Sequence, residues 1–159
     1  MSLFDEQVKP MLAFLSEPFD SKEWIFEIKF DGTRCIAYID KEKKKVKFLN
    51  RRLKYFEERY PELQKIYENI NANKVVLDGE IVIFKNGKPD FQALQEREQV
   101  GERARIEILS QLNPATYVVF DILHKDGKDL IDLPLMERKK ILRETVKESK
   151  EVLISVYVL

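Results

Sequence analysis

The sequence predicts an α+β domain built from antiparallel sheets with flanking helices. Segments with the two-residue alternation of strands outnumber segments with helical spacing, and tight turns join most neighbouring strands. The chain has 159 residues, of which 44% are hydrophobic and 35% charged, as expected for one globular domain. It carries 28 basic and 28 acidic residues, so the net charge is zero and composition alone indicates no nucleic-acid partner.

The first part of the chain predicts an antiparallel meander. Residues 24–31 alternate apolar and polar side chains, which predicts a half-buried strand. Its inward face would carry Trp24, Phe26, Ile28 and Phe30. The Asp31-Gly32 pair predicts a turn into a second strand over residues 33–40, and a third strand over residues 45–50 follows a charged run.

The rest of the chain mixes strands and helices. Residues 61–70 begin with proline and carry apolar residues at helical spacing, which predicts a short amphipathic helix. Asn86-Gly87 predicts a hairpin turn within the strand-like residues 74–91. We expect further helices at residues 90–98, 102–112 and 135–148, and further strands at residues 116–123 and 152–159. The last strand is expected to be buried, which indicates a chain that stops inside a larger domain.

The sequence excludes several common kinds of site. It has neither a GxxxxGK[ST] nor a GxGxxG segment, so no glycine-rich phosphate loop is indicated. Its single histidine, His124, and single cysteine, Cys35, cannot form a zinc site of recognisable spacing. We expect His124 at the surface and Cys35 as a buried structural thiol. One cysteine and no apolar run near the roughly 20 residues that span a bilayer predict a cytoplasmic chain without a membrane partner.

Three short elements place charged side chains within or at the end of an apolar strand. They are "EIKFDGTR" at residues 27–34, "LDGEIVIF" at residues 77–84 and "VVFDIL" at residues 118–123. Each element alone is typical of a hairpin turn or of charges that face solvent. Because all three share this placement of charge, they are the candidate functional segments of the chain.

Taken in order, these elements resemble a known superfamily. The spacing K-x-D-G-x-R from Lys29, D-G-E from Asp78 and the pair Phe120-Asp121 resemble motifs I, III and IIIa of the covalent nucleotidyltransferases. That superfamily includes ATP-dependent DNA ligases, RNA ligases and mRNA capping enzymes. The flanking segments "KPMLAF", "FLNRRLKYFEERYPEL" and "LPLMERKKIL" resemble DNA ligases, most of all the ligase domain of multifunctional end-joining ligases. One residue departs from the family pattern, since Asn50 stands where serine is usual.

This resemblance implies an incomplete, ATP-grasp-like nucleotidyltransferase fold, the DNA ligase adenylation domain. It implies that Lys29 is the catalytic nucleophile, which attacks the α-phosphate of ATP and becomes a lysyl-AMP. It also assigns nucleotide contacts: Glu27 at the adenine edge, Phe120 stacked on the base, Glu80 at the ribose and Mg²⁺, and Arg34 and Arg51 at ribose and phosphate oxygens. The implied cofactors are therefore ATP and Mg²⁺.

Elementary electrostatics sets a condition on this site. A lysine must lose its proton to act as a nucleophile, and neighbouring carboxylates favour its charged form. Glu27 and Asp31 lie two residues on either side of Lys29. We therefore expect positive charge near Lys29, from Arg34, from Mg²⁺ or from both, and we expect Glu27 to be engaged elsewhere.

The family's motifs IV and V and its oligonucleotide-binding domain have no counterpart in the sequence. We therefore expect residues 1–159 to be the N-terminal part of an adenylation domain from a longer ligase that seals nicked or broken double-stranded DNA in repair. The isolated chain should adenylate slowly or not at all, because electrostatic stabilisation is a large catalytic effect. Two alternatives stay open: a non-catalytic assembly module that pairs through an exposed sheet edge, and an RNA ligase or capping-type enzyme.

Overall fold

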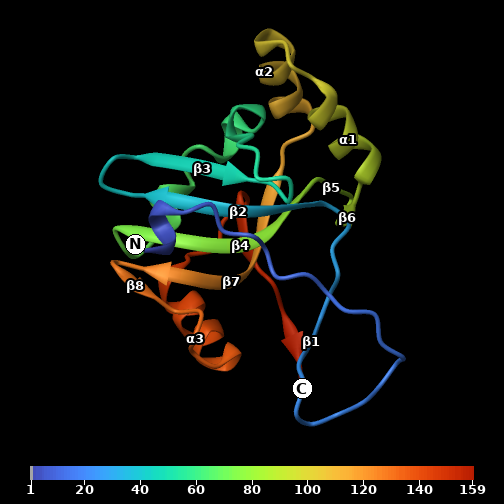
Figure 1. Cartoon of the computed structure of the whole chain (residues 1–159). Coiled ribbons are helices and arrows are strands. Elements are labelled where there is room, and N and C mark those ends of the chain that lie inside the picture. Colours follow the sequence, from blue (N-terminus) through green and yellow to red (C-terminus); the bar gives the residue numbers. More distant parts are fainter. Residues whose placement is uncertain (1) are drawn as a thin grey trace.

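The computed structural model describes residues 2–159 and confirms the α+β class (Figure 1). Its longer strands are β2 Thr33–Asp40, β3 Lys45–Leu49, β4 Lys74–Val82 and β7 Thr116–Lys125; β8 Lys128–Asp129 and β9 Val152–Ile154 are short. These six strands form one sheet in the order β3-β2-β4-β7-β8, with β9 beside β7. Two further pairs are β1 Phe26–Glu27 with β10 Tyr157–Val158, and β5 Phe84–Lys85 with β6 Lys88–Pro89.

The central strands β2, β4 and β7 bring three candidate segments side by side. Between β2 and β4, Arg34 lies opposite Glu80 and Ile36 lies opposite Asp78. Across the next ladder, Asp78 lies opposite Asp121, and this ladder contains two register shifts. The sheet is antiparallel as predicted, apart from the short parallel pairing of β9 with β7.

Two hydrophobic layers cover the two faces of the sheet. Cys35 of β2 points into the larger layer, so the prediction of a buried thiol is confirmed. Helices and turns form that layer with the sheet. On the opposite face, Ile36 and Tyr38 of β2 pack against an N-terminal segment that begins with the 3₁₀ turn η1 Leu3–Asp5. Figure 1 shows this blue segment running along the sheet before the chain turns back to β1.

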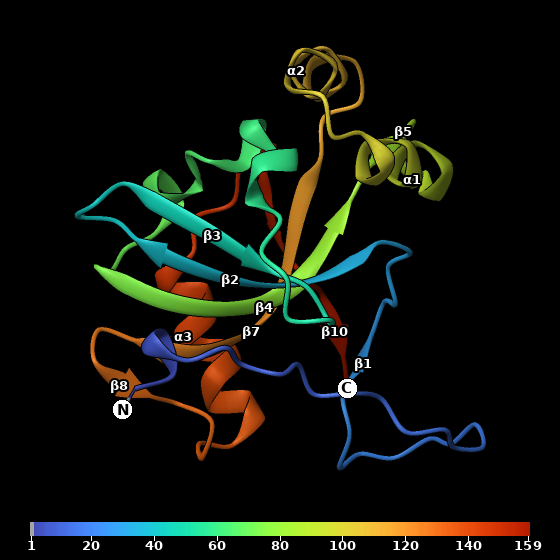
Figure 2. The same cartoon turned by 45° about the horizontal axis from the view of Figure 1, so that its top comes forward.

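Three α-helices occur within the described residues: α1 Phe91–Gln99, α2 Arg103–Leu112 and α3 Leu135–Thr145. All three lie where the sequence predicts helices. The side chain of Asp90 caps α1 by accepting the N–H of Ala93 at 3.0 Å. Figure 2 shows α1 and α2 beyond the ends of β4 and β7, whereas α3 packs against β7.

The predicted helix over residues 61–70 is wrong in type. The structure has two 3₁₀ turns there, η3 Pro61–Leu63 and η4 Ile66–Asn69, and a third just before them, η2 Glu57–Arg59. The apolar residues are nevertheless buried as expected: Leu63, Ile66 and Ile70. A helix shorter than about 12 residues is marginal by itself, so packing against the sheet decides the local geometry.

The predicted strand over residues 24–31 is also wrong. Only the two residues of β1 have strand geometry, and they pair with β10 rather than with β2. Trp24 and Ile28, predicted to face inward, are 59% and 65% exposed. The reason is that β3 and β4 already occupy both edges of β2, so no edge is free for a hairpin at Asp31-Gly32.

Two tight turns are built on Xaa-Gly pairs, and the first of them is the predicted Asn86-Gly87 turn. Asn86 and Gly87 have φ values of 53° and 73° and join β5 to β6, while Asp126 and Gly127 have φ values of 45° and 83° and join β7 to β8. His124, expected at the surface, is 1% exposed because β7 continues to Lys125.

The C-terminal residues do not form the single buried strand that was predicted. They divide into β9, which joins the main sheet, and β10, which joins β1. Val158 and Leu159 are largely exposed. Within residues 2–159, no helix combines the length and the apolar composition needed to cross a membrane.

Candidate functional site

The sheet register gathers predicted site residues at one end of the central strands. Arg34 stands near the start of β2, opposite Glu80 of β4. Phe120 comes from β7, the neighbour of β4, and its ring centroid lies 4.8 Å from the guanidinium carbon of Arg34. Three residues from separate parts of the sequence therefore form one cluster.

A buried carboxylate fixes the guanidinium of Arg34. Its Nε and Nη2 donate to the two oxygens of Asp78, both at 2.7 Å, and Nη2 also donates to the carbonyl of Met11 at 3.0 Å. Burial raises the pKa of Asp78, and the bonded Arg34 opposes that rise. This bidentate pairing holds Arg34 over Phe120 and reduces the net positive charge that Arg34 presents to Lys29.

A second arginine–aspartate pair lies beside the first. Arg138 of α3 donates from Nε and Nη2 to the carboxylate of Asp121 at 2.9 and 3.0 Å. Because Asp121 faces Asp78 across the ladder, two like charges lie close together in a buried setting, and each is compensated by its own arginine. The pair also joins α3 to β7.

Lys29 lies in the exposed stretch between β1 and β2. Its side chain makes no hydrogen bond or ion pair with the described residues 2–159. Burial raises the pKa of Glu80, while the positive charges of Arg34 and then Lys29 oppose this rise, which places Lys29 within electrostatic reach of Glu80. Gly32 allows the chain after Lys29 to pass close to β4, because a Cβ at this position would lie 2.3 Å from the carbonyl oxygen of Ile81.

Glu27 has a partner that the sequence reasoning missed. Lys139 of α3 is buried, and its ammonium donates to Glu27 Oε1 and to the carbonyl oxygen of Phe120. A signal was available, because Lys139 lies four residues after Leu135 and three before Leu142, on the apolar stripe of the helix. A charge at such a position has to find a buried partner.

Arg51 stands apart from this cluster. It is exposed in the turn after β3, and its side chain forms no hydrogen bond or ion pair with another described residue. The preceding Asn50 organises the turn, since its side-chain oxygen accepts the N–H groups of Arg52 and Lys54 at 2.9 and 3.0 Å. Asparagine therefore performs a local structural task at the position where the family usually has serine.

The carboxylates of the cluster limit how a metal could bind. No group of three or more histidine, cysteine, aspartate or glutamate residues suited to a metal occurs in residues 2–159. Asp78 and Asp121 are both engaged by arginines, so Glu80 is the carboxylate that the cluster leaves for a metal. Mg²⁺ is usually held by one or two carboxylates together with substrate phosphates, and Glu80 fits that pattern.

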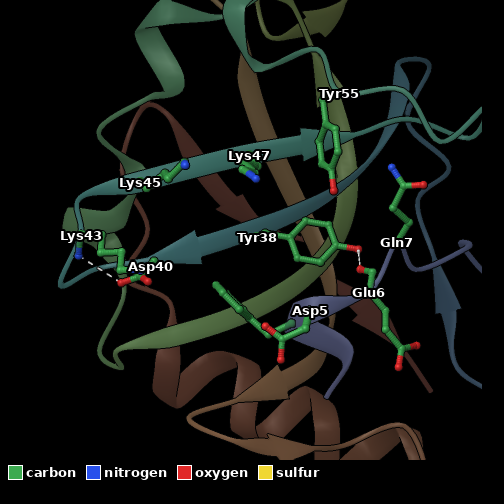
Figure 3. A pocket seen from close by; sticks show the side chains of 10 residues that line it. Asp5, Glu6, Gln7, Tyr38, Asp40, Lys43, Lys45, Lys47 and Tyr55 are labelled. Atoms are coloured by element: carbon green, nitrogen blue, oxygen red, sulfur yellow. Dashed lines mark hydrogen bonds between the residues drawn. The ribbon is translucent and has the colours of Figure 1, made fainter. Parts of the chain in front are cut away.

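A cavity of about 330 Å³ lies farther along the same face of the sheet (Figure 3). Figure 3 shows Lys45 and Lys47 of β3 on one side of Tyr38, and Asp5 and Glu6 of the N-terminal segment on the other. Its lining residues include none of the six predicted site residues. The hollow is therefore separate from the cluster at the end of the strands.

The chain is similar in sequence to several known proteins. LigD of Pseudomonas aeruginosa, a multifunctional non-homologous end joining protein, is 35% identical over 147 residues, covering 92% of this chain and 16% of that protein. The DNA ligase-like protein LigB from the SPbeta prophage of Bacillus subtilis is 33% identical, covering 92% of this chain and 50% of that protein. The DNA ligase of Methanocaldococcus jannaschii is 35% identical, covering 87% and 25%. The chain thus spans half or less of the length of these relatives.

Solved structures agree with this relationship. The ligase domain of LigD from M. tuberculosis superposes with a TM-score of 0.67 at 25% identity, covering 86% of this chain and 40% of that chain. A mycobacterial DNA ligase D in complex with ATP has the same fold, with a TM-score of 0.65 at 23% identity over 85% of this chain and 40% of that one. A family model described as the ATP dependent DNA ligase domain matches residues 7–158. The chain therefore belongs to the ATP-dependent DNA ligase domain family.

Proposed function

We propose that residues 1–159 form the N-terminal part of a DNA ligase adenylation domain and that Lys29 accepts AMP from ATP. The observation that carries the proposal is the convergence of Arg34, Glu80 and Phe120 beside Lys29 in a member of this family. In the reaction, the unprotonated Nζ of Lys29 attacks the α-phosphorus of ATP. Pyrophosphate leaves, a phosphorus–nitrogen bond forms, and the amine releases a proton.

The other residues bind and orient the nucleotide. The flat face of Phe120 stacks on the base, and Glu27 accepts a hydrogen bond from the base edge. Glu80 contacts the ribose and would hold Mg²⁺, whose charge would offset the negative charge of the phosphates. Arg34 and Arg51 contact ribose and phosphate oxygens.

The electrostatics favour a slow reaction in the chain as it stands. Arg34 is paired with Asp78, which offsets much of the positive charge that could stabilise the phosphates during the transfer. Asp31 adds negative charge near Lys29, whereas Glu27 is neutralised by Lys139. We therefore infer weak self-adenylation by this chain and full activity in a longer, cytoplasmic ligase whose substrate is nicked or broken double-stranded DNA.

Labelling with α-³²P ATP and Mg²⁺ tests the assignment. Wild-type chain should take up a small amount of label, Lys29→Ala should take up none, and Lys88→Ala should match the wild type because Lys88 is exposed on β6. Label that survives Lys29→Ala would refute the role of Lys29. Rapid stoichiometric labelling would refute the inferred slowness, and preference for GTP would favour a capping-type enzyme.

A second candidate function is a non-catalytic assembly module. The observation that favours it is the exposure of apolar side chains in two places, residues 11–28 and β10. Phe14 in the first of these is 97% exposed. Light scattering during size-exclusion chromatography separates the two candidates. A stable dimer that binds no ATP supports the assembly module, and a monomer that binds ATP supports the ligase fragment.

A further inference from the structure

The ammonium of Lys139 joins two parts of the domain that share no backbone ladder. β1 belongs to the two-stranded sheet with β10, whereas β7 belongs to the six-stranded sheet. Lys139 reaches both, since it donates to Glu27 of β1 and to the carbonyl of Phe120 in β7. Its Nζ also lies 6.0 Å from the ring centroid of Tyr157 in β10.

Burial makes this contact energetically important. Lys139 is only 3% exposed, and a lysine is almost never buried without compensating partners. An ammonium only donates hydrogen bonds, so both of its contacts require acceptors on the two strands. Loss of this charge would free Glu27 to change its side-chain conformation and would remove the polar link between β1 and β7.

The contact leaves Glu27 partly available. Lys139 bonds Oε1, whereas Oε2 has no hydrogen-bond partner within residues 2–159, and the side chain is 27% exposed. A carboxylate oxygen accepts hydrogen bonds and does not donate them. An acceptor fixed at this place selects a base edge that donates, such as an exocyclic amine, and disfavours one that presents a carbonyl oxygen.

We propose that Lys139 is a positioning residue for base selection: it orients Glu27 so that Oε2 accepts a hydrogen bond from the exocyclic amine of a purine. This inference rests on the proposed nucleotide site and adds a residue that acts through Glu27. It predicts a preference for a 6-aminopurine that depends on the charge of Lys139.

Equilibrium binding of nucleoside monophosphates tests the proposal without requiring transfer to Lys29. Titration calorimetry compares AMP with purine riboside 5′-monophosphate, which lacks the amine. Wild-type chain should prefer AMP about tenfold, the effect of one hydrogen bond to a charged group. Lys139→Met should abolish the preference by weakening AMP alone, and the exposed-neighbour control Lys140→Met should retain it.

The alternative outcomes are distinct. If Lys139→Met weakens both nucleotides equally, or only lowers the melting temperature, Lys139 has a structural role and the proposal fails. Should Lys139→Met not fold, Lys139→Gln keeps a donor without the charge; the preference should then fall at least threefold, and an unchanged preference overturns the proposal. A wild-type chain that binds neither nucleotide refutes the proposed nucleotide site itself.

Discussion

The central strands and the exposed apolar segment, residues 11–28, are both rich in large apolar side chains but bury them to opposite extents. Ile36 of β2 and Leu77 of β4 are inaccessible to solvent, whereas Phe14 is 97% exposed. Each central strand has a neighbour on both edges and a packed layer on both faces. The apolar segment has one strand pairing, the two-residue ladder of β1 with β10, and single contacts of Met11 with Arg34 and of Glu27 with Lys139. Burial thus depends on available partners as well as on composition.

The proposed chemistry lies at the boundary between these regions. The sheet carries Arg34, Glu80 and Phe120, and their relative positions follow from the ladders. The apolar segment and the stretch that follows it carry Glu27 and Lys29. Half of the site therefore rests on the packed sheet, whereas the other half depends on Gly32 and on the contact of Glu27 with Lys139.

The largest expected effect comes from truncating one phenylalanine in each region. Phe48 of β3 is fully buried, so Phe48→Ala should lower the free energy of unfolding by about 3–5 kcal/mol. Phe14→Ala removes an exposed ring and should change it by less than about 0.5 kcal/mol. Urea denaturation followed by circular dichroism measures both. A loss above about 1 kcal/mol for Phe14→Ala would mean that this ring is packed in solution, contrary to its exposure in the structure.

A smaller effect is expected from two glycines, one inside the sheet and one outside it. A Cβ on Gly79 would lie 2.4 Å from the carbonyl oxygen of Val118 in β7, so Gly79→Ala should cost about 1–3 kcal/mol. Gly101 has no atom within 4 Å of such a Cβ, and Gly101→Ala should stabilise by at most about 1 kcal/mol. Thermal denaturation of the two variants checks the contrast. Equal melting temperatures would contradict the close approach of β4 to β7.

The smallest effect is expected from the N-terminal turn, because residues 3–8 pack on the sheet whereas residues 11–28 are largely exposed. Asp129 accepts the N–H of Leu3 at 3.1 Å and bonds His124, and these contacts lower the pKa of its carboxyl. A lowered pKa means that the ionised carboxyl stabilises the fold at pH values above the ordinary pKa of 3.8. This stabilisation is lost as the pH falls through the lowered pKa.

Asp129→Asn should therefore reduce the acid-induced loss of stability below about pH 3.8, with a small amplitude because the carboxyl is exposed. Urea titrations at pH 7 and pH 3 measure this difference. The exposed neighbour Asp132 has no bonded partner within residues 2–159, so Asp132→Asn serves as the control and should follow the wild type. Identical pH dependence in all three proteins would show that Asp129 does not hold the N-terminal turn.

Local patterns predicted much of the fold. Strong alternation between turn signals located β2, β4 and β7 and the Asn86-Gly87 hairpin, because these features depend on neighbouring residues. The same alternation over residues 24–31 predicted a strand that the structure lacks. Both edges of β2 are paired with β3 and β4, and no local pattern in residues 24–31 shows this. His124 was misplaced because β7 continues to Lys125 and because Phe4, from the distant N-terminal turn, lies beside its ring.

The sequence by itself determined the α+β class, the family and the candidate residues, because spacing, turn chemistry and motif order are properties of the linear chain. The tertiary structure alone decided which charges meet. It paired Arg34 with Asp78 and Glu27 with Lys139, contacts that span 44 and 112 residues of sequence. A buried charge requires a partner wherever the fold supplies one, and only the sheet register and the position of α3 determine which partner that is.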